Sequence, residues 1–255
     1  MTIRQGVRPF VTANFAITWD GHISTRENTP SDFSSSKDKR GLLEIRATCD
    51  AVLASAKTVA ADNMTMGLPD AELRAQRTAR GQSEYPLRVL LSNSGQIQPE
   101  WRIFTQKFSP IVIFSTTRMP ESIQAALATQ ADVWLDDRSS VNLHGLMRTL
   151  HEDYGVRRLV CEGGGQIFRS LLSAGLVDEL HLTLCPRIFG GVKAPTITGL
   201  VGSFLPKAIS LKLREFRVVE HECFLRYRIS ARSTPSGKAV CRGDQPNPFA
   251  KCPSN

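Results

Sequence analysis

The sequence predicts an α/β fold in which a mixed, mostly parallel sheet is covered by helices on its faces. Short apolar or β-branched runs alternate with amphipathic segments along residues 9–230, which is the pattern of strands connected by helices. The last two strand-like runs, 209–219 and 224–229, follow one another without a helix between them. Because so short a connection joins antiparallel strands, we expect a C-terminal hairpin that makes the sheet mixed at one edge.

The elements can be placed in order along the chain. The predicted strands lie at 9–17, 50–54, 87–91, 111–115, 133–135, 157–161, 179–185, 209–219 and 224–229. The predicted helices lie at 37–47, 120–128, 142–154 and 166–174, with a further short helix from about Lys57. One helix has an apolar stripe at i, i+3, i+4 and i+7, which predicts core packing and is formed by Leu143, Leu146, Met147 and Leu150. The polar stretch 70–86 is expected at the surface, as a charged helix followed by a loop.

Three parts are expected: a lead at 1–8, one domain at 9–230 and a basic tail at 231–255. The tail holds four of the fourteen prolines and almost no apolar periodicity, so it is predicted to be flexible.

The net charge of +8 lies mostly in the lead and the tail, and the domain itself is nearly balanced. It has no block of like charges, so we predict no nucleic-acid binding. No apolar run reaches the roughly 18 residues of a membrane span, and the N-terminus lacks the apolar region of a secretory signal. These observations favour a cytoplasmic protein without a membrane partner.

The six cysteines and five histidines show no metal-binding spacing. Cys-x-x-Cys, His-x-His and His-Glu-x-x-His are all missing from the sequence, so no metal site is predicted. Cys49, Cys161, Cys185 and Cys223 lie in or beside apolar runs and are expected to be buried thiols in a reducing compartment.

The segment 156–175 carries the strongest sign of a ligand. A buried strand is predicted to end at Glu162, and three glycines separate it from a helix that begins near Gln166. Glycines let a ligand approach the backbone, and the free N–H groups of a helix start attract a pyrophosphate. The alternative is a tight turn without a ligand. Glu162 is placed to hydrogen-bond a polyol or orient a substrate, or else to bind loop amides.

Two further clusters carry polar residues at regular spacing. A strand at 9–17 would place Asn14 and Ala16 on one side of the sheet. Thr58 and Asp62 are four residues apart and share a helix face, although they are equally compatible with a helix start and a surface charge.

Together these clusters resemble the reductase domain of the riboflavin-biosynthesis deaminase–reductase (RibD) family, whose fold is related to dihydrofolate reductase. The resemblance is carried by Arg-Pro-Phe-Val, Asn-Phe-Ala and Asp-Gly within 8–21, and by Arg-Ala, Asp-Ala-Val-Leu, Thr-Val and Asp-Asn within 46–63. It continues with Glu-Gly-Gly-Gly, Leu-Leu-Ser-Ala-Gly-Leu-Val-Asp-Glu-Leu and Pro-Arg-Ile-Phe-Gly-Gly within 162–191. It implies a three-layer α/β/α domain, and a homodimer.

The resemblance also implies an NADPH-dependent 5-amino-6-(5-phosphoribosylamino)uracil reductase, with hydride transfer to C1′ of the ring-opened sugar. It assigns cofactor contacts to Ala16, Phe33, Thr58, Asp62, Gly163, Gly164, Gly165, Gln166, Ile167 and Phe168. It assigns substrate contacts to Ser31, Arg46, Met66 and Glu162, with the arginine on the phosphate. Catalytic roles fall to Glu162, Asn14 and Asp62.

Two other functions stay open from the sequence. One is a reductase of another heterocycle, such as a pterin or dihydrofolate, and the other is an NADPH-binding module without catalysis.

Overall fold

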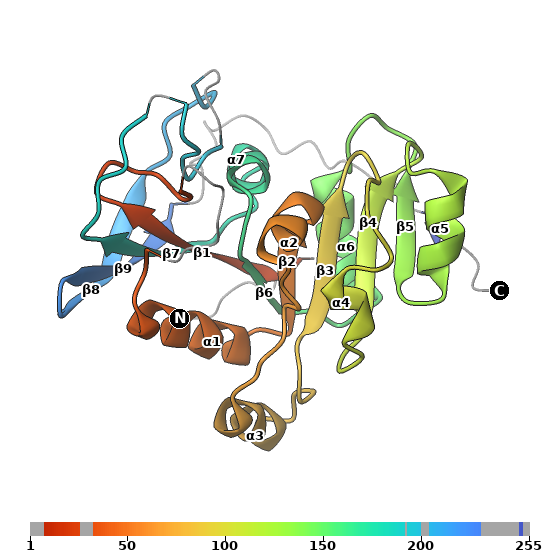
Figure 1. Ribbon diagram of the computed structural model, residues 1–255, viewed down its shortest axis with the longest axis horizontal. Helices are drawn as coiled ribbons and strands as arrows, with labels where there is room; N and C mark the ends of the chain where they lie inside the picture. The colour runs from red at the N-terminus through yellow and green to blue at the C-terminus, as the bar shows by residue number, and fades with distance from the viewer. Residues whose placement is uncertain (1–7, 26–32, 192, 200–203, 231–249, 252–255) are drawn as a thin grey trace, which may run out of the picture.

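The computed structural model describes residues 8–25, 33–191, 193–199, 204–230 and 250–251, which build one ten-stranded sheet flanked by helices (Figure 1). The strands are β1 (Phe10–Thr18), β2 (Ala51–Ser55), β3 (Leu87–Ser92), β4 (Ile111–Thr116), β5 (Asp132–Asp136), β6 (Arg158–Cys161), β7 (Glu179–Cys185), β8 (Leu211–Val219), β9 (Glu222–Ile229) and β10 (Ala250–Lys251). The helices are α1 (Ser36–Thr48), α2 (Ala56–Asp62), α3 (Ala71–Ala79), α4 (Arg102–Thr105), α5 (Glu121–Ala128), α6 (Leu143–Glu152) and α7 (Gly165–Ser173).

The strands lie in the order β10-β5-β4-β3-β2-β6-β1-β7-β9-β8. The seven strands from β5 to β7 in this order are parallel to one another. At the two ends of the sheet, β10 is antiparallel to β5, and β9 is antiparallel to both β7 and β8. The predicted mixed, mostly parallel sheet with a C-terminal hairpin is therefore confirmed.

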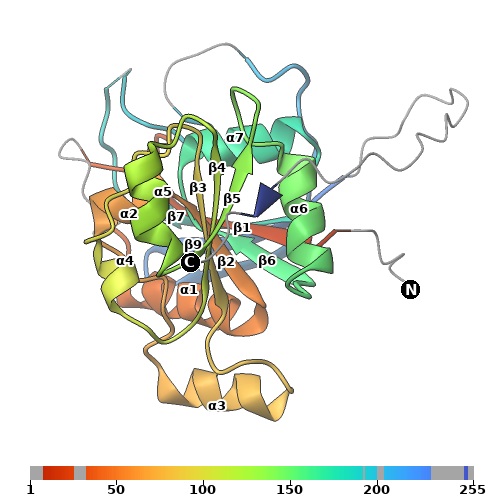
Figure 2. The same cartoon turned by 90° about the vertical axis from the view of Figure 1, so that its right-hand side faces the viewer.

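Helices cover both faces of the sheet and give it three layers (Figure 2). Helices α6 and α7 pack on the face to which β1 contributes Val11, Ala13 and Phe15. Helices α2, α4 and α5 pack on the opposite face, to which β2 contributes Val52 and Ala54. Alternation along each strand supplies both cores, as period-two side-chain geometry requires. Helix α1 lies on the second face, and α3 packs against α1 outside the sheet.

Side chains fix where several helices begin. Ser35 accepts the N–H groups of Lys37 and Asp38 at the start of α1, and Ser55 accepts that of Thr58 at the start of α2. These side chains satisfy donors that a helix start leaves without an intrahelical partner. Ser55 is the last residue of β2 and Ser35 follows β1 in the chain, so α1 and α2 begin at the carboxyl edge of the sheet.

Several expectations need correction. The predicted lead ends in Arg8, whose guanidinium is tied to the Asp178 carboxylate at 2.7 and 3.0 Å. The polar stretch 70–86 does form a helix, α3, yet Leu73 and Arg77 are buried against α1 and its end. Helix α4 was not predicted. Residues 250–251 form β10, whose backbone pairs antiparallel with β5; 231–249 and 252–255 lie outside the described residues, so the flexibility of the tail stays a prediction.

The thiols of Cys49, Cys161 and Cys185 are buried and unpaired, as predicted, and Cys223 is half-buried. Burial raises the pKa of Cys49 to about 11 and that of Cys161 to about 12, which keeps both thiols protonated and unreactive. Within the described ranges, no helix is long and apolar enough to cross a bilayer.

Leu146 tests the predicted apolar stripe of α6, whose members Leu146, Met147 and Leu150 are fully buried. We expect Leu146→Ala to lower the free energy of unfolding by about 2–5 kcal/mol, because it leaves a cavity between α6 and the sheet. The exposed neighbour His144 supplies the control, and His144→Ala should change stability by less than about 0.5 kcal/mol. Equal midpoints for the two variants in urea titrations would contradict this packing.

Candidate active site where the strand order reverses

The candidate site lies at the carboxyl ends of the neighbouring strands β2 and β6. After β2 the chain enters α2 on one face of the sheet, and after β6 it enters α7 on the other. Two adjacent parallel strands whose following helices diverge in this way leave a crevice, which is where open α/β sheets bind ligands. Glu162 stands at this point, with its N–H bonded to the carbonyl of Leu53 at 3.0 Å.

The three glycines after Glu162 are required by the packing of the protein itself. A Cβ on Gly163 would lie 2.6 Å from Thr58 Cγ2, and one on Gly165 would lie 2.4 Å from the backbone nitrogen of Gly199. Gly164 has a φ of 85°, which is strained for any other residue. We expected these glycines to make room for a ligand. In the structure they admit α2 on one side and the 196–199 turn on the other, and their contact with a ligand stays a prediction.

A ligand is instead offered the N-terminus of α7 and two hydroxyl groups. The N-cap of α7 is Gly164, and no described side chain caps the first turn. Beside this helix start, the hydroxyl groups of Ser55 and Thr58 lie 2.8 Å apart. Uncapped N–H groups and hydroxyl donors are the groups that bind a pyrophosphate, so these residues fit a dinucleotide.

The other cofactor positions on α7 divide by exposure. Gln166 is exposed, whereas the side chains of Ile167 and Phe168 are buried in the core. The Phe168 ring packs 4.9 Å from that of Phe15. Only the backbone of Ile167 and Phe168 can therefore face a ligand.

Arg46 and Glu162 form a buried ion pair beside the crevice. Arg46 Nε and Nη2 donate to the two Glu162 carboxylate oxygens at 2.6 Å each, and Nη1 donates to the Gly67 carbonyl at 2.6 Å. The side chains are only 9% and 2% exposed. The two predicted substrate residues therefore lie together. However, the structure directs the Arg46 donors at Glu162 and Gly67, whereas the sequence led us to expect them on a substrate phosphate.

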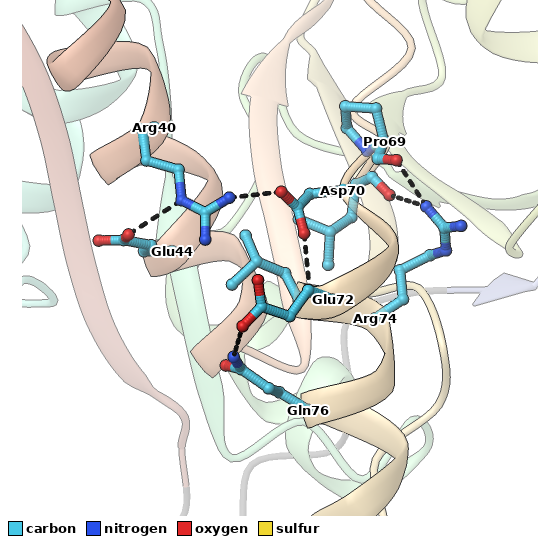
Figure 3. Close-up of polar contacts among 9 residues, drawn as sticks. Arg40, Glu44, Pro69, Asp70, Glu72, Arg74 and Gln76 are labelled. Atoms are coloured by element: carbon cyan, nitrogen blue, oxygen red, sulfur yellow. Dashed lines mark hydrogen bonds and ion pairs between the residues drawn. The ribbon is translucent and has the colours of Figure 1, made fainter.

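A hydrogen-bond network between α1 and α3 fixes the loop that contains the Gly67 carbonyl, to which Arg46 donates (Figure 3). Arg40 of α1 donates to Glu44 and to Asp70, the N-cap residue of α3. Arg74 of α3 donates to the carbonyls of Leu68 and Pro69, which directly follow Gly67 (Figure 3). The network thus fixes the loop that supplies the Gly67 carbonyl.

Arg77 fixes the end of α1, which carries Arg46. It is 1% exposed, and its guanidinium donates to the carbonyls of Arg46, Ala47 and Cys49 at the end of α1. Because Arg46 lies in the last turn of α1, this cap also sets the position of Arg46 itself. The composition of 70–86 showed only its charge and gave no sign of this role.

A pocket of about 340 Å³ runs between α1 and strands β1, β7, β9 and β8. Asn14 of β1 and Thr183 of β7 both line it. In the strand register Asn14 pairs with His181, and Ala16 pairs with Thr183. Asn14 and Ala16 therefore share one face, as predicted. The charged lining residues are Asp38, Glu44, Arg158, Glu179, His181, Glu215, Arg217 and Arg226.

The remaining predicted residues are more scattered. The Phe33 ring lies 5.2 Å from that of Phe189, in a T-shaped pair. Met66 has a buried side chain and a φ of 57°, so that only its backbone is offered to a ligand. Asp62 ends α2, one turn beyond Thr58, and its role stays a prediction. Ser31 lies outside the described residues.

Sequence reasoning missed Asp38, which is 8% exposed and lines the pocket. Its carboxyl hydrogen-bonds with Thr183 and Ser34. Burial, helped by the nearby Glu222 carboxylate, raises the pKa of Asp38. An acid in the first turn of a helix is usually a solvated partner of the helix dipole, so the sequence alone gave no reason to expect burial.

The Arg46–Glu162 pair can be tested by a double-mutant cycle. Arg46→Met and Glu162→Leu should each lower the free energy of unfolding by about 3–5 kcal/mol, since each leaves one buried charge without its partner. The double variant should lose much less than the sum. As a matched control, Glu44→Gln breaks a pair whose side chains are 41% and 52% exposed and should cost less than about 1 kcal/mol. Additive losses in urea unfolding would show that the two charges are uncoupled.

The chain is similar to known reductases over nearly its whole length. It is 31% identical over 224 residues to the 2,5-diamino-6-ribosylamino-4(3H)-pyrimidinone 5′-phosphate reductase of Methanothermobacter thermautotrophicus, covering 88% of this chain and 99% of that protein. It is 33% identical over 191 residues to the reductase of the same name from Archaeoglobus fulgidus, covering 75% of this chain and 86% of that one.

Solved structures agree on the fold. A pyrimidine reductase-like protein from Corynebacterium diphtheriae superposes with a TM-score of 0.75 at 22% identity, covering 87% of this chain and 92% of that one. A riboflavin biosynthesis reductase from Saccharomyces cerevisiae gives a TM-score of 0.66 at 18% identity, covering 90% and 93%. Residues 9–224 match the sequence profile of the RibD C-terminal domain. The chain therefore belongs to the RibD C-terminal domain family.

Proposed function

We propose that this protein is the NADPH-dependent reductase of a phosphorylated ribosylaminopyrimidine in riboflavin biosynthesis. The names of the archaeal relatives favour 2,5-diamino-6-ribosylamino-4(3H)-pyrimidinone 5′-phosphate as the substrate. The sequence led us to 5-amino-6-(5-phosphoribosylamino)uracil, which carries the same ribosylamino side chain. The reaction at C1′ is the same for either ring.

The observation that carries this proposal is the set of groups gathered at the carboxyl ends of β2 and β6. It joins an uncapped start of α7 and the hydroxyls of Ser55 and Thr58 to the buried Arg46–Glu162 pair. NADPH, when bound, supplies a hydride to C1′ of the ring-opened sugar. The protein binds its pyrophosphate at the first turn of α7 and holds the reactants in line.

Glu162 acts on the sugar chain in this proposal. Two Arg46 donors fix the orientation of its carboxylate, which suits it to accept hydrogen bonds from ribose hydroxyls. Arg46 thereby orients Glu162, and its remaining N–H bonds are available to an anionic substrate.

We further infer that the protein is a cytoplasmic homodimer that forms through β8. This edge strand exposes four apolar residues, Leu211, Leu213, Phe216 and Val218. A bulge at Arg214 keeps all four on one face, because they pair with Ile229, Tyr227, Leu225 and Cys223 of β9 in turn. An apolar stripe at an uncovered sheet edge is an association surface, and a second copy would bury it symmetrically. The buried free thiols suit a reducing compartment.

An NADPH-oxidation assay tests the proposed activity. We expect turnover with the diaminopyrimidinone phosphate or the aminouracil phosphate, and none with dihydrofolate. Steady turnover of dihydrofolate alone would show that the protein is a pterin reductase instead. Tight NADPH binding without turnover of any of the three would leave a binding module.

Sedimentation velocity tests the dimer. Phe216→Asp should convert the protein to a monomer, because the charge would be buried in the interface. Lys212→Asp is the matched control, since Lys212 is exposed on the opposite face of the same strand and its variant should stay dimeric. A monomeric wild-type protein at micromolar concentration would overturn the proposal.

A further inference from the structure

Asp38 is a buried carboxyl group that lines the pocket. It lies in the first turn of α1 and hydrogen-bonds with Thr183, which pairs with Ala16 across β1 and β7. Asn14 follows two residues before Ala16 on the same face and lines the same pocket. Asp38 is therefore held over the part of β1 that the sequence assigns to the reacting end of the cofactor.

The surroundings of Asp38 favour its neutral form. Glu222 of β9 is 5% exposed and has its carboxylate bound by the N–H and hydroxyl of Ser35 at 2.8 and 2.5 Å. Burial is the largest effect that opposes ionisation of Asp38, and the negative charge of Glu222 adds to it, while the hydrogen bonds with Thr183 and Ser34 and the charge of Lys39 act in the opposite direction; the pKa of Asp38 is raised on balance. Cys185 of β7 is buried nearby, and burial, helped by the Glu222 carboxylate, raises the pKa of its thiol.

Two other carboxyl groups near the pocket are bound by basic side chains. Glu162 is paired with Arg46, and Glu179 lies 2.8 Å from His181 Nε2. The partners of Glu179 lower its pKa against the opposing effect of burial. Among the described residues that line the pocket, Asp38 is the carboxyl whose hydrogen bonds go to hydroxyl groups, which carry no positive charge.

We propose that Asp38 is the catalytic acid of the reduction, a role that rests on the proposed function. The substrate is the ring-opened sugar, in which C1′ forms a C=N bond to the amino nitrogen of the pyrimidine. As a dihydronicotinamide gives its hydride to C1′ and is oxidised, the π electrons of the C=N bond move to nitrogen. The nitrogen takes the Asp38 proton and becomes a secondary amine. Solvent entering the open pocket returns a proton to the carboxylate.

Protonation of Asp38 can be measured without any substrate. In protein with ¹³C-labelled aspartate, we expect one carboxyl resonance to titrate above the ordinary value of about 4, and to be missing from Asp38→Asn. Because its pKa is raised in the folded protein, the stability that Asp38 contributes is present at low pH and is lost as pH rises through that pKa. The melting temperature of Asp38→Asn relative to wild type should therefore increase from acidic to neutral pH.

The kinetic test separates proton transfer from binding. Asp38→Asn should lower kcat by about 100-fold or more and leave NADP⁺ affinity unchanged, since general acids contribute about 10²–10⁴-fold. The wild-type rate should fall as pH rises through the Asp38 pKa, and the variant should lose that dependence. Asp38→Glu, which restores an acid, should recover part of kcat.

Glu121→Gln is the matched control. Glu121 is also an acid in the first turn of a helix, but it is exposed at the start of α5 and should leave kcat unchanged when replaced. An ordinary titration of Asp38, or an unaltered kcat and pH profile in Asp38→Asn, would overturn the inference. Wild-type protein that fails to turn over either pyrimidine would instead refute the proposed function, while the titration would still report the state of Asp38.

Discussion

The insertion of β6 between β1 and β2 is the constraint on which the site depends. These three strands are not consecutive in the chain, so β2 and β6 continue into helices on opposite faces at the same edge. Divergence opens a crevice, and it also presses the start of α7 against α2 on one side and the 196–199 turn on the other. A Cβ on Gly163 would meet the Thr58 side chain and one on Gly165 the backbone of the 196–199 turn, and this is why only glycine fits at these two positions.

Three buried arginines hold the loops around the sheet. Arg46 is bound by Glu162 and a carbonyl, whereas Arg77 and Arg88 are bound by backbone carbonyls alone among the hydrogen bonds that the described residues make. Burial lowers the pKa of Arg88 to about 10, and Phe108 offers its ring face 4.3 Å away. A guanidinium that caps several carbonyls joins loops that have little apolar surface of their own. Rigid loops at the sheet edge are what a precise site requires.

The sequence predicts the parts of the structure that depend on local patterns. Strand alternation, the stripe of α6 and the strand-to-helix turn at Glu162 follow from the order of apolar residues, and all are observed. The backbone pairing of β10 and the reason for the glycines depend on segments distant in the chain, which periodicity does not report. Asp38 is the sharpest case. Its neighbours Thr183 and Glu222 are more than a hundred residues away, so its burial exists only in the folded protein.

Helix α1 places two acidic side chains, Glu162 and Asp38, in different electrostatic environments. Arg46, near its end, holds Glu162 as a carboxylate, while Asp38, in its first turn, is enclosed by hydroxyls and a second acid. The two positions are eight residues apart, or about 12 Å along the helix axis. In the proposed reaction a hydride and a proton must reach adjacent atoms, and a permanent anion is suited only to orientation. One carboxylate bound by a guanidinium for orientation and one buried carboxyl group for proton transfer allow one site to perform both tasks, so the rigidity of α1 between its caps becomes a requirement of the chemistry.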